Sequence, residues 1–157
     1  MSKSGKLTLD PVLWLATGFG AGKMPRAPGT FGTAVAVPLV MLLQPLGLWI
    51  YSVITLGLVL VGIVICGKAA ERMGVHDDPS IVWDEIAGYF ITMLAVPSSA
   101  AALLFGFGLF RLLDISKPWP IRWLDRHVSG GLGIMLDDVA AAIVANLILR
   151  AIIPASW

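Results

Sequence analysis

Two pairs of adjacent carboxylates are the residues of this chain best suited to chemistry. Asp84 and Glu85 lie inside an otherwise apolar stretch, and Asp137 and Asp138 come directly before another one. An ionised carboxylate without a partner is strongly disfavoured near a bilayer, so each pair must contact basic residues or bind a hard cation through oxygen. A helix N-cap would explain one of Asp137 and Asp138, but not both. The sequence therefore predicts that these four residues are metal ligands and catalytic acids.

Basic residues lie between the two acidic pairs. Arg111, Asp114 and Lys117 are spaced three apart and are predicted to line one helix face, and Arg126 follows in the same segment. Ion pairs that satisfy one another would explain this spacing equally well. Beside a bound cation, however, Arg111, Lys117 and Arg126 would neutralise the charge that develops on a phosphoryl group. Mg²⁺ suits such a site because it prefers oxygen ligands and shares a phosphate, whereas cysteine and histidine ligands for zinc are too few.

A third polar segment precedes the first long apolar run. Its backbone N–H groups from Gly29 to Thr33, including those of Thr30 and Gly32, could bind a phosphate at the start of a helix. A plain Pro/Gly-rich turn, with Thr30 or Thr33 as the N-cap, is the simpler alternative. His76, in the loop before Asp84, could serve in acid–base chemistry, and a histidine with a structural hydrogen bond is equally compatible with that position.

The composition indicates a membrane protein of one domain, residues 1–157. Hydrophobic residues make up 57% of the chain and charged residues only 13%, while water-soluble domains carry nearer to about 25% charged residues. The formal net charge is +1 and no basic stripe accompanies it, which argues against nucleic acid as a partner. No feature of the sequence predicts an oligomeric state.

Charge-free stretches locate the predicted membrane helices. Asp, Glu, Lys and Arg are absent from residues 27–67, 86–110 and 139–149, and an ionised side chain at the bilayer centre costs about 3 kcal/mol or more. Proline and glycine break the first stretch at residues 44–47, and Pro97 breaks the second. The prediction is an all-α, polytopic bundle of about five membrane helices, at residues 32–43, 48–70, 80–96, 100–115 and 137–153. Residues 11–22 are too short to span and are predicted to form an interfacial helix with Trp14 at headgroup level.

The predicted hairpins bring the polar loops to one membrane face. Residues 23–30, 68–85 and 111–138 would share that face, together with the basic residues Lys23, Arg26, Lys68, Arg72, Arg111, Lys117, Arg122 and Arg126. The positive-inside rule makes this face cytoplasmic. Trp83, Trp119 and Trp123 fall where an aromatic belt is expected.

Four motifs resemble the phosphatidylglycerophosphatase A family in order and spacing: APGTFGT, GVHDDPSIVWDEIAG, FRLLDISKPWPIRWLDR and GGLGIMLDD. The resemblance runs from about Gly18 to the end of the chain. It implies an all-helical, Mg²⁺-dependent phosphatase of the bacterial inner membrane that converts phosphatidylglycerophosphate to phosphatidylglycerol. The family's acidic residues correspond to Asp84, Glu85, Asp137 and Asp138, and its arginine and lysine correspond to Arg111 and Lys117, with Asp114 between them.

Direct hydrolysis is the mechanism that the sequence favours, because no Ser-His-Asp or cysteine nucleophile is present in a recognisable arrangement. An aspartyl-phosphate intermediate remains open. Two other classes of membrane protein share some of these features. A CDP-alcohol phosphotransferase also uses aspartates and Mg²⁺, but in one segment and not in two distant pairs. A small ion transporter would place its ionisable residues near the bilayer midplane.

Overall fold

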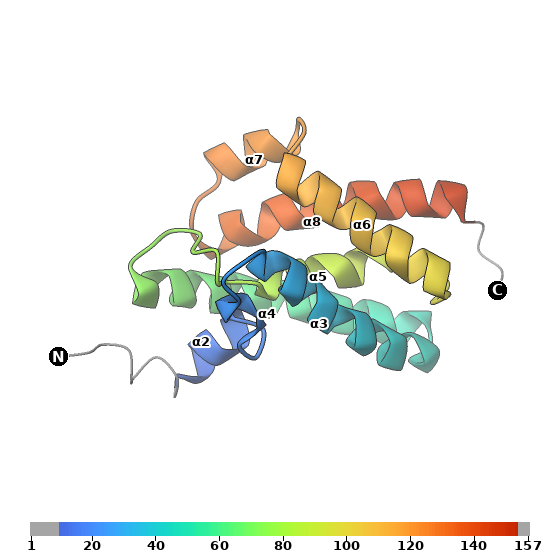
Figure 1. The fold of residues 1–157 in the computed structure, drawn as a ribbon, viewed down its shortest axis with the longest axis horizontal. Helices are drawn as coiled ribbons and strands as arrows, with labels where there is room; N and C mark the ends of the chain where they lie inside the picture. Colours follow the sequence, from blue (N-terminus) through green and yellow to red (C-terminus); the bar gives the residue numbers. More distant parts are fainter. Residues whose placement is uncertain (1–9, 154–157) are drawn as a thin grey trace.

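The computed structural model describes residues 10–153, and this part of the chain is helical without strands (Figure 1). The elements in chain order are α2 (Pro11–Ala16), η1 (Ala21–Lys23), α3 (Pro28–Leu43), η2 (Gln44–Leu46), α4 (Leu48–Met73), α5 (Trp83–Thr92), α6 (Ala100–Ser116), α7 (Ile121–His127) and α8 (Gly130–Ile152). The all-α prediction is confirmed for this range.

Three helical segments are long and apolar enough to cross a membrane: Pro28–Leu46, Leu48–Met73 and Gly130–Ile152. The first two form a hairpin whose turn contains Pro45 and ends at Gly47, where φ is 97° and a side chain would be strained. The predicted break at residues 44–47 is therefore confirmed. The predicted set of about five spanning helices is not confirmed by length and composition.

The largest departure from the predicted helices is α5. A span was expected over residues 80–96, but α5 has only 10 residues, about 15 Å of helix. The chain leaves the helix at Met93 and turns through Ala95, where φ is 56°. Pro97 restricts the backbone of Val96, but it lies five residues after Thr92 and does not by itself end the helix there. The short helix packs against α3, α4, α6 and α8.

Side chains from neighbouring helices satisfy the carbonyl groups freed where α5 ends. Inside a bilayer, a backbone carbonyl without a hydrogen bond costs several kcal/mol. The donors are Asn146 Nδ2 to the carbonyls of Thr92 (2.9 Å) and Leu94 (2.7 Å), Gln44 Nε2 to those of Met93 and Val96 (both 2.8 Å), and Tyr51 Oη to that of Phe90 (2.9 Å). The bundle thus holds an interrupted helix in its interior.

Replacing Asn146 with leucine should destabilise the protein by about 1–3 kcal/mol, because two buried carbonyls lose their donor. Thermal unfolding of the purified protein in detergent measures this change. The control is Ser52→Ala, since the Ser52 hydroxyl donates to the Leu48 carbonyl within its own helix at an exposed position. Equal melting temperatures for Asn146→Leu and the unmodified protein would contradict the role of this side chain.

The N-terminal element is shorter than predicted. Helix α2 covers six residues, and turns followed by η1 replace the rest of the expected interfacial helix. Leu13 and Ala16 are buried, whereas Trp14 is exposed. The helix packs on α4, and Arg72 of α4 forms an ion pair with Asp10, which also caps α2.

Helix α8 begins at Gly130, seven residues before the predicted start. Glycine permits this because the two helices are in close contact: a Cβ on Gly131 would lie 1.9 Å from the Ile63 carbonyl oxygen of α4. Asp137 and Asp138 are therefore inside the helix, and the alternative that one of them is an N-cap is wrong. Together, α2, the end of α4, α7 and the start of α8 lie toward one end of the bundle, at the left of Figure 1.

Candidate active site

Five carboxylates from three helices converge at this end of the bundle. They form two groups whose oxygen atoms lie within 4.8 Å of one another, and we refer to them together as the acidic cluster: Asp84, Glu85 and Asp138 in one group, and Asp114, Asp137 and Asp138 in the other. Asp138 belongs to both groups. The two acidic pairs, far apart in sequence, thus meet at a single site.

The helices explain how adjacent residues can serve different groups. Neighbouring residues on a helix point about 100° apart, so Asp138 can reach the α5 carboxylates while Asp137 is directed toward Lys117, whose Nζ lies 2.7 Å from Asp137 Oδ2. Asp84 and Glu85 occupy the first turn of α5, where the positive end of the helix dipole stabilises negative charge. Asp114 is supplied by the last turns of α6.

Three carboxylate oxygens of the acidic cluster are buried without a hydrogen-bond partner among the described residues. They are Asp84 Oδ1, Glu85 Oε2 and Asp138 Oδ2, one from each member of the first group. Asp84 is 6% exposed and Asp138 is 3% exposed. A buried neutral polar group without a hydrogen-bond partner costs about 1–3 kcal/mol of stability, and a buried anionic oxygen without a partner costs more. A hard cation bound through oxygen would remove this cost, so the residues present fit Mg²⁺.

Arg111 is a basic residue that contacts the first group. It forms an ion pair with Asp114 on the same helix, and its Nη1 lies 3.6 Å from Glu85 Oε1. The Arg111 Nε atom is buried without an acceptor. This guanidinium therefore keeps one donor free for an oxyanion while its other contacts hold it against the acidic cluster.

Lys117 contacts the second group, but by a different route from the predicted one. Helix α6 ends at Ser116, and Lys117 follows in the left-handed region, φ 42°, before Pro118. The prediction that Asp114 and Lys117 share a helix face is wrong. The Lys117 Nζ instead lies 2.6 Å from Asp125 of α7 and 2.7 Å from Asp137. Burial lowers the pKa of Lys117, but attraction to these two carboxylates outweighs it and raises the pKa.

The start of α3 contacts the acidic cluster through Gly29. A Cβ on this residue would lie 2.2 Å from Glu85 Oε1 and 2.9 Å from both terminal nitrogens of Arg111. Ala27 is the residue at the N-cap position, so Thr30 and Thr33 are not N-caps. The N–H groups of Thr30 and Phe31 both bond to the Ala27 carbonyl, which reduces the number of N–H groups available to an anion.

Gly32 and Thr33 have packing contacts in the structure. A Cβ on Gly32 would lie 2.5 Å from Val82 Cβ, so this glycine allows α3 to approach the residue before α5. Thr33 is fully buried, and its hydroxyl donates to the Gly29 carbonyl at 2.9 Å. Both residues hold Gly29 in place beside the acidic cluster.

His76 and Arg126 lie outside the two carboxylate groups. His76 is exposed, and its Nε2 accepts a hydrogen bond from the Gly130 N–H at 3.0 Å. Arg126 is also exposed and lines a surface hollow with Trp119, Arg122 and Trp123. Among the described residues, Arg126 forms no ion pair with the acidic cluster. Asp125, which binds Lys117, and Gly29, which leaves room for Glu85 and Arg111, are two site residues whose roles the sequence pattern does not predict.

Comparison with known proteins gives consistent results. A family model for phosphatidylglycerophosphatase A matches residues 14–153. Phosphatidylglycerophosphatase A of Escherichia coli is 44% identical over 153 residues, which cover 95% of this chain and 87% of the relative. The Haemophilus influenzae protein of the same name is 47% identical over 146 residues, with 92% and 90% covered. A putative phosphatidylinositol-3-phosphatase of Bacteroides thetaiotaomicron is 36% identical over 148 residues, with 88% and 91% covered. No solved structure matches the chain significantly.

Proposed function

Because this chain belongs to the phosphatidylglycerophosphatase A family, we propose that it hydrolyses phosphatidylglycerophosphate to phosphatidylglycerol and inorganic phosphate. The observation that carries this proposal is the acidic cluster, with three buried carboxylate oxygens that lack a partner. A phosphomonoester on a lipid headgroup can reach such a site while its acyl chains stay in the bilayer.

Mg²⁺ is the proposed cofactor. Asp84, Glu85 and Asp138 would hold one ion, and Asp114 and Asp137 with the shared Asp138 offer a second position. When bound, Mg²⁺ would supply Lewis-acid stabilisation of the phosphate and lower the pKa of a water molecule. The retained waters typical of Mg²⁺ suit a site that must also admit a phosphate.

The basic residues have a separate part in the proposed reaction. Arg111 would donate from its free Nε to a phosphate oxygen, while Asp114 keeps the guanidinium in position. Lys117, fixed between Asp125 and Asp137, adds positive charge beside the second group. Both residues thereby neutralise charge that grows on the phosphoryl oxygens.

The proposed chemistry is direct hydrolysis. A carboxylate of the acidic cluster accepts a proton from a water molecule as the water oxygen bonds to phosphorus. The bond from phosphorus to the ester oxygen breaks, and the carboxylic acid formed in the first step returns its proton to the lipid oxygen, which leaves as an alcohol. Radiolabelled phosphate trapped covalently on an aspartate would contradict this route and favour a phospho-enzyme.

Removing divalent cations should abolish the activity. We expect phosphate release from phosphatidylglycerophosphate in detergent micelles when Mg²⁺ is present. The release should fall to background with excess EDTA and return when Mg²⁺ is restored. The physical reason is that the acidic cluster without a cation repels the phosphate. Full activity in EDTA would contradict the proposed metal requirement. No phosphate release with any divalent cation would contradict the proposed phosphatase activity and favour a phosphotransferase.

The relatives also bear on substrate selectivity. Two of them are named for phosphatidylglycerophosphate, and the relative at 36% identity is named for a phosphoinositide. All three names refer to a substrate that is a phosphomonoester on a membrane lipid. We assign phosphatidylglycerophosphate to this chain because the relatives named for it have the higher identities.

The proposed location is the bacterial inner membrane, with the acidic cluster at the cytoplasmic face. Support comes from the basic residues near this end of the bundle, among them Arg72, Arg111 and Lys117. We propose that α3, α4, α6 and α8 cross the bilayer. Helix α5 and the turn after it would make a fifth crossing inside the bundle, since Gln44 at the α3–α4 tip binds the carbonyls of Met93 and Val96.

A further inference from the structure

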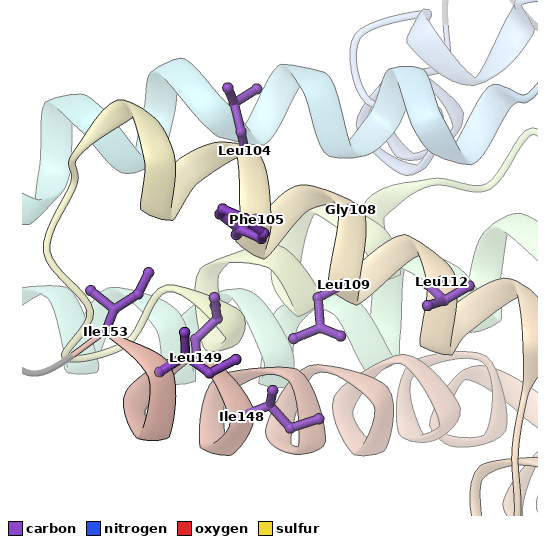
Figure 2. Close-up of a pocket in the computed structure, with 9 residues that line it drawn as sticks. Leu104, Phe105, Gly108, Leu109, Leu112, Ile148, Leu149 and Ile153 are labelled. Atoms are coloured by element: carbon purple, nitrogen blue, oxygen red, sulfur yellow. The ribbon is translucent and has the colours of Figure 1, made fainter.

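An apolar groove runs between α6 and α8 on the surface of the bundle (Figure 2). Its volume is about 410 Å³, within the range of ligand pockets, about 300–1,000 Å³. Phe105 and Leu112 on one wall and Ile152 on the other are more than 60% exposed. The groove is therefore open along its length to the surroundings of the bundle, which for this protein are lipid.

Gly108 keeps this groove open. A Cβ on Gly108 would have no atom within 4 Å, so no contact within the protein requires a glycine there. Gly106 on the same helix is different, because its Cβ would lie 2.8 Å from Met93 Sδ and 3.2 Å from Leu149 Cδ1. Gly106 serves helix packing, whereas Gly108 only leaves space on the groove side of α6.

The groove lies on the same face of α8 as one carboxylate of the acidic cluster. Ile148 lines the groove and follows Asp137 by 11 residues, which is about three helical turns, so the two side chains share a helix face. Helix α6 runs antiparallel to α8: Gly106 lies beside Leu149, whereas Lys117, just after the end of α6, binds Asp137. The wall of the groove on α6 therefore ends, at Leu112, near the cluster.

The depth of the groove fits one leaflet. Leu104, the groove residue of α6 farthest along the helix from Asp114, precedes that carboxylate by 10 residues, a rise of about 15 Å. Half of a hydrocarbon core of about 30 Å is about 15 Å. A lipid with its phosphate at the acidic cluster would have one acyl chain of this reach beside α6 and α8.

We propose that the α6–α8 groove binds one acyl chain of the lipid phosphomonoester substrate and so positions the headgroup at the acidic cluster. The inference rests on the proposed function and adds to it the part of the protein that recognises the lipid tail. The groove would favour this lipid over bulk lipid through packing contacts and through the anchored headgroup. The hydrophobic effect gives no preference, because the acyl chain is free of water both in the bilayer and in the groove.

Gly108→Phe tests the groove, and Gly57→Phe is the matched control. Gly57 is a helical glycine in α4, also without atoms within 4 Å of its Cβ, and outside the groove. For long-chain phosphatidylglycerophosphate, Gly108→Phe should raise KM about fivefold, which corresponds to about 1 kcal/mol, with kcat unchanged. KM for the deacylated, soluble phosphate ester should not change in either variant. An unchanged KM in Gly108→Phe, or equal increases of KM in both variants, would overturn the inference that the groove binds an acyl chain of the substrate.

Crosslinking gives a readout that does not need turnover. Phosphatidylglycerophosphate with a photoreactive group in one acyl chain should label α6 and α8 at the groove more than phosphatidylcholine with the same chain does, and Gly108→Phe should remove the excess. Equal labelling by both lipids would mean bulk lipid in the groove and would overturn the inference. If the unmodified protein releases no phosphate from either ester, the proposed function fails, while the labelling comparison still decides whether the groove prefers this lipid.

Discussion

Replacing Asp138 with asparagine should reduce the rate of phosphate release by about a thousandfold, while the protein remains folded. Asp138 is the carboxylate shared by both groups of the acidic cluster, and its Oδ2 is buried without a partner. Asparagine keeps the shape and one oxygen but removes the negative charge and places an NH₂ donor toward a cation. The expected loss exceeds the about 10–100-fold typical of residues that only support metal ligands.

The control for Asp138→Asn is Asp78→Asn. Asp78 is in the loop before α5, and its Oδ1 accepts hydrogen bonds from the Ser80 N–H and hydroxyl, which asparagine can still accept. Initial rates are measured at saturating substrate over a range of Mg²⁺ concentrations, with a melting temperature for each variant. Activity in Asp138→Asn within tenfold of the unmodified protein would exclude Asp138 as a central ligand.

Adding one methyl group at Gly29 should also be severe, with activity reduced about a hundredfold. The Cβ of alanine would lie 2.2 Å from Glu85 Oε1 and 2.9 Å from the Arg111 terminal nitrogens, so either α3 or these two side chains must move. A displacement of about 1 Å in catalytic groups can cost about 10²-fold in rate. The substitution would thus disturb the geometry of Glu85 and Arg111 without changing either of these residues.

Gly57→Ala is the matched control for Gly29→Ala, because its Cβ has no atom within 4 Å and alanine favours a helix by up to about 1 kcal/mol. The measurement is kcat with the Mg²⁺ dependence of the rate. A shift of the Mg²⁺ dependence in Gly29→Ala alone would place the damage at Glu85. Normal activity in Gly29→Ala would show that the start of α3 has no influence on the acidic cluster.

The helical class and the chemistry of the site follow from local features of the sequence. Charge-free stretches mark apolar helices because a bilayer penalises ionised groups residue by residue, and the break at residues 44–47 follows from proline and glycine. The two acidic pairs are recognisable without a fold, because carboxylates beside lipid need a partner wherever they lie. Together with the family motifs, this predicts the reaction class.

Tertiary contacts decided the rest. Helix α5 is short because the bundle supplies donors, Asn146 and Gln44, for the carbonyls freed where it ends; no periodicity in residues 80–96 contains that information. The early start of α8 depends on the close contact between Gly131 and α4. Lys117 binds Asp125 and Asp137 only because the chain turns at Pro118 and returns through α7. Such pairings depend on distances between segments remote in sequence, and spacing along one chain cannot specify them.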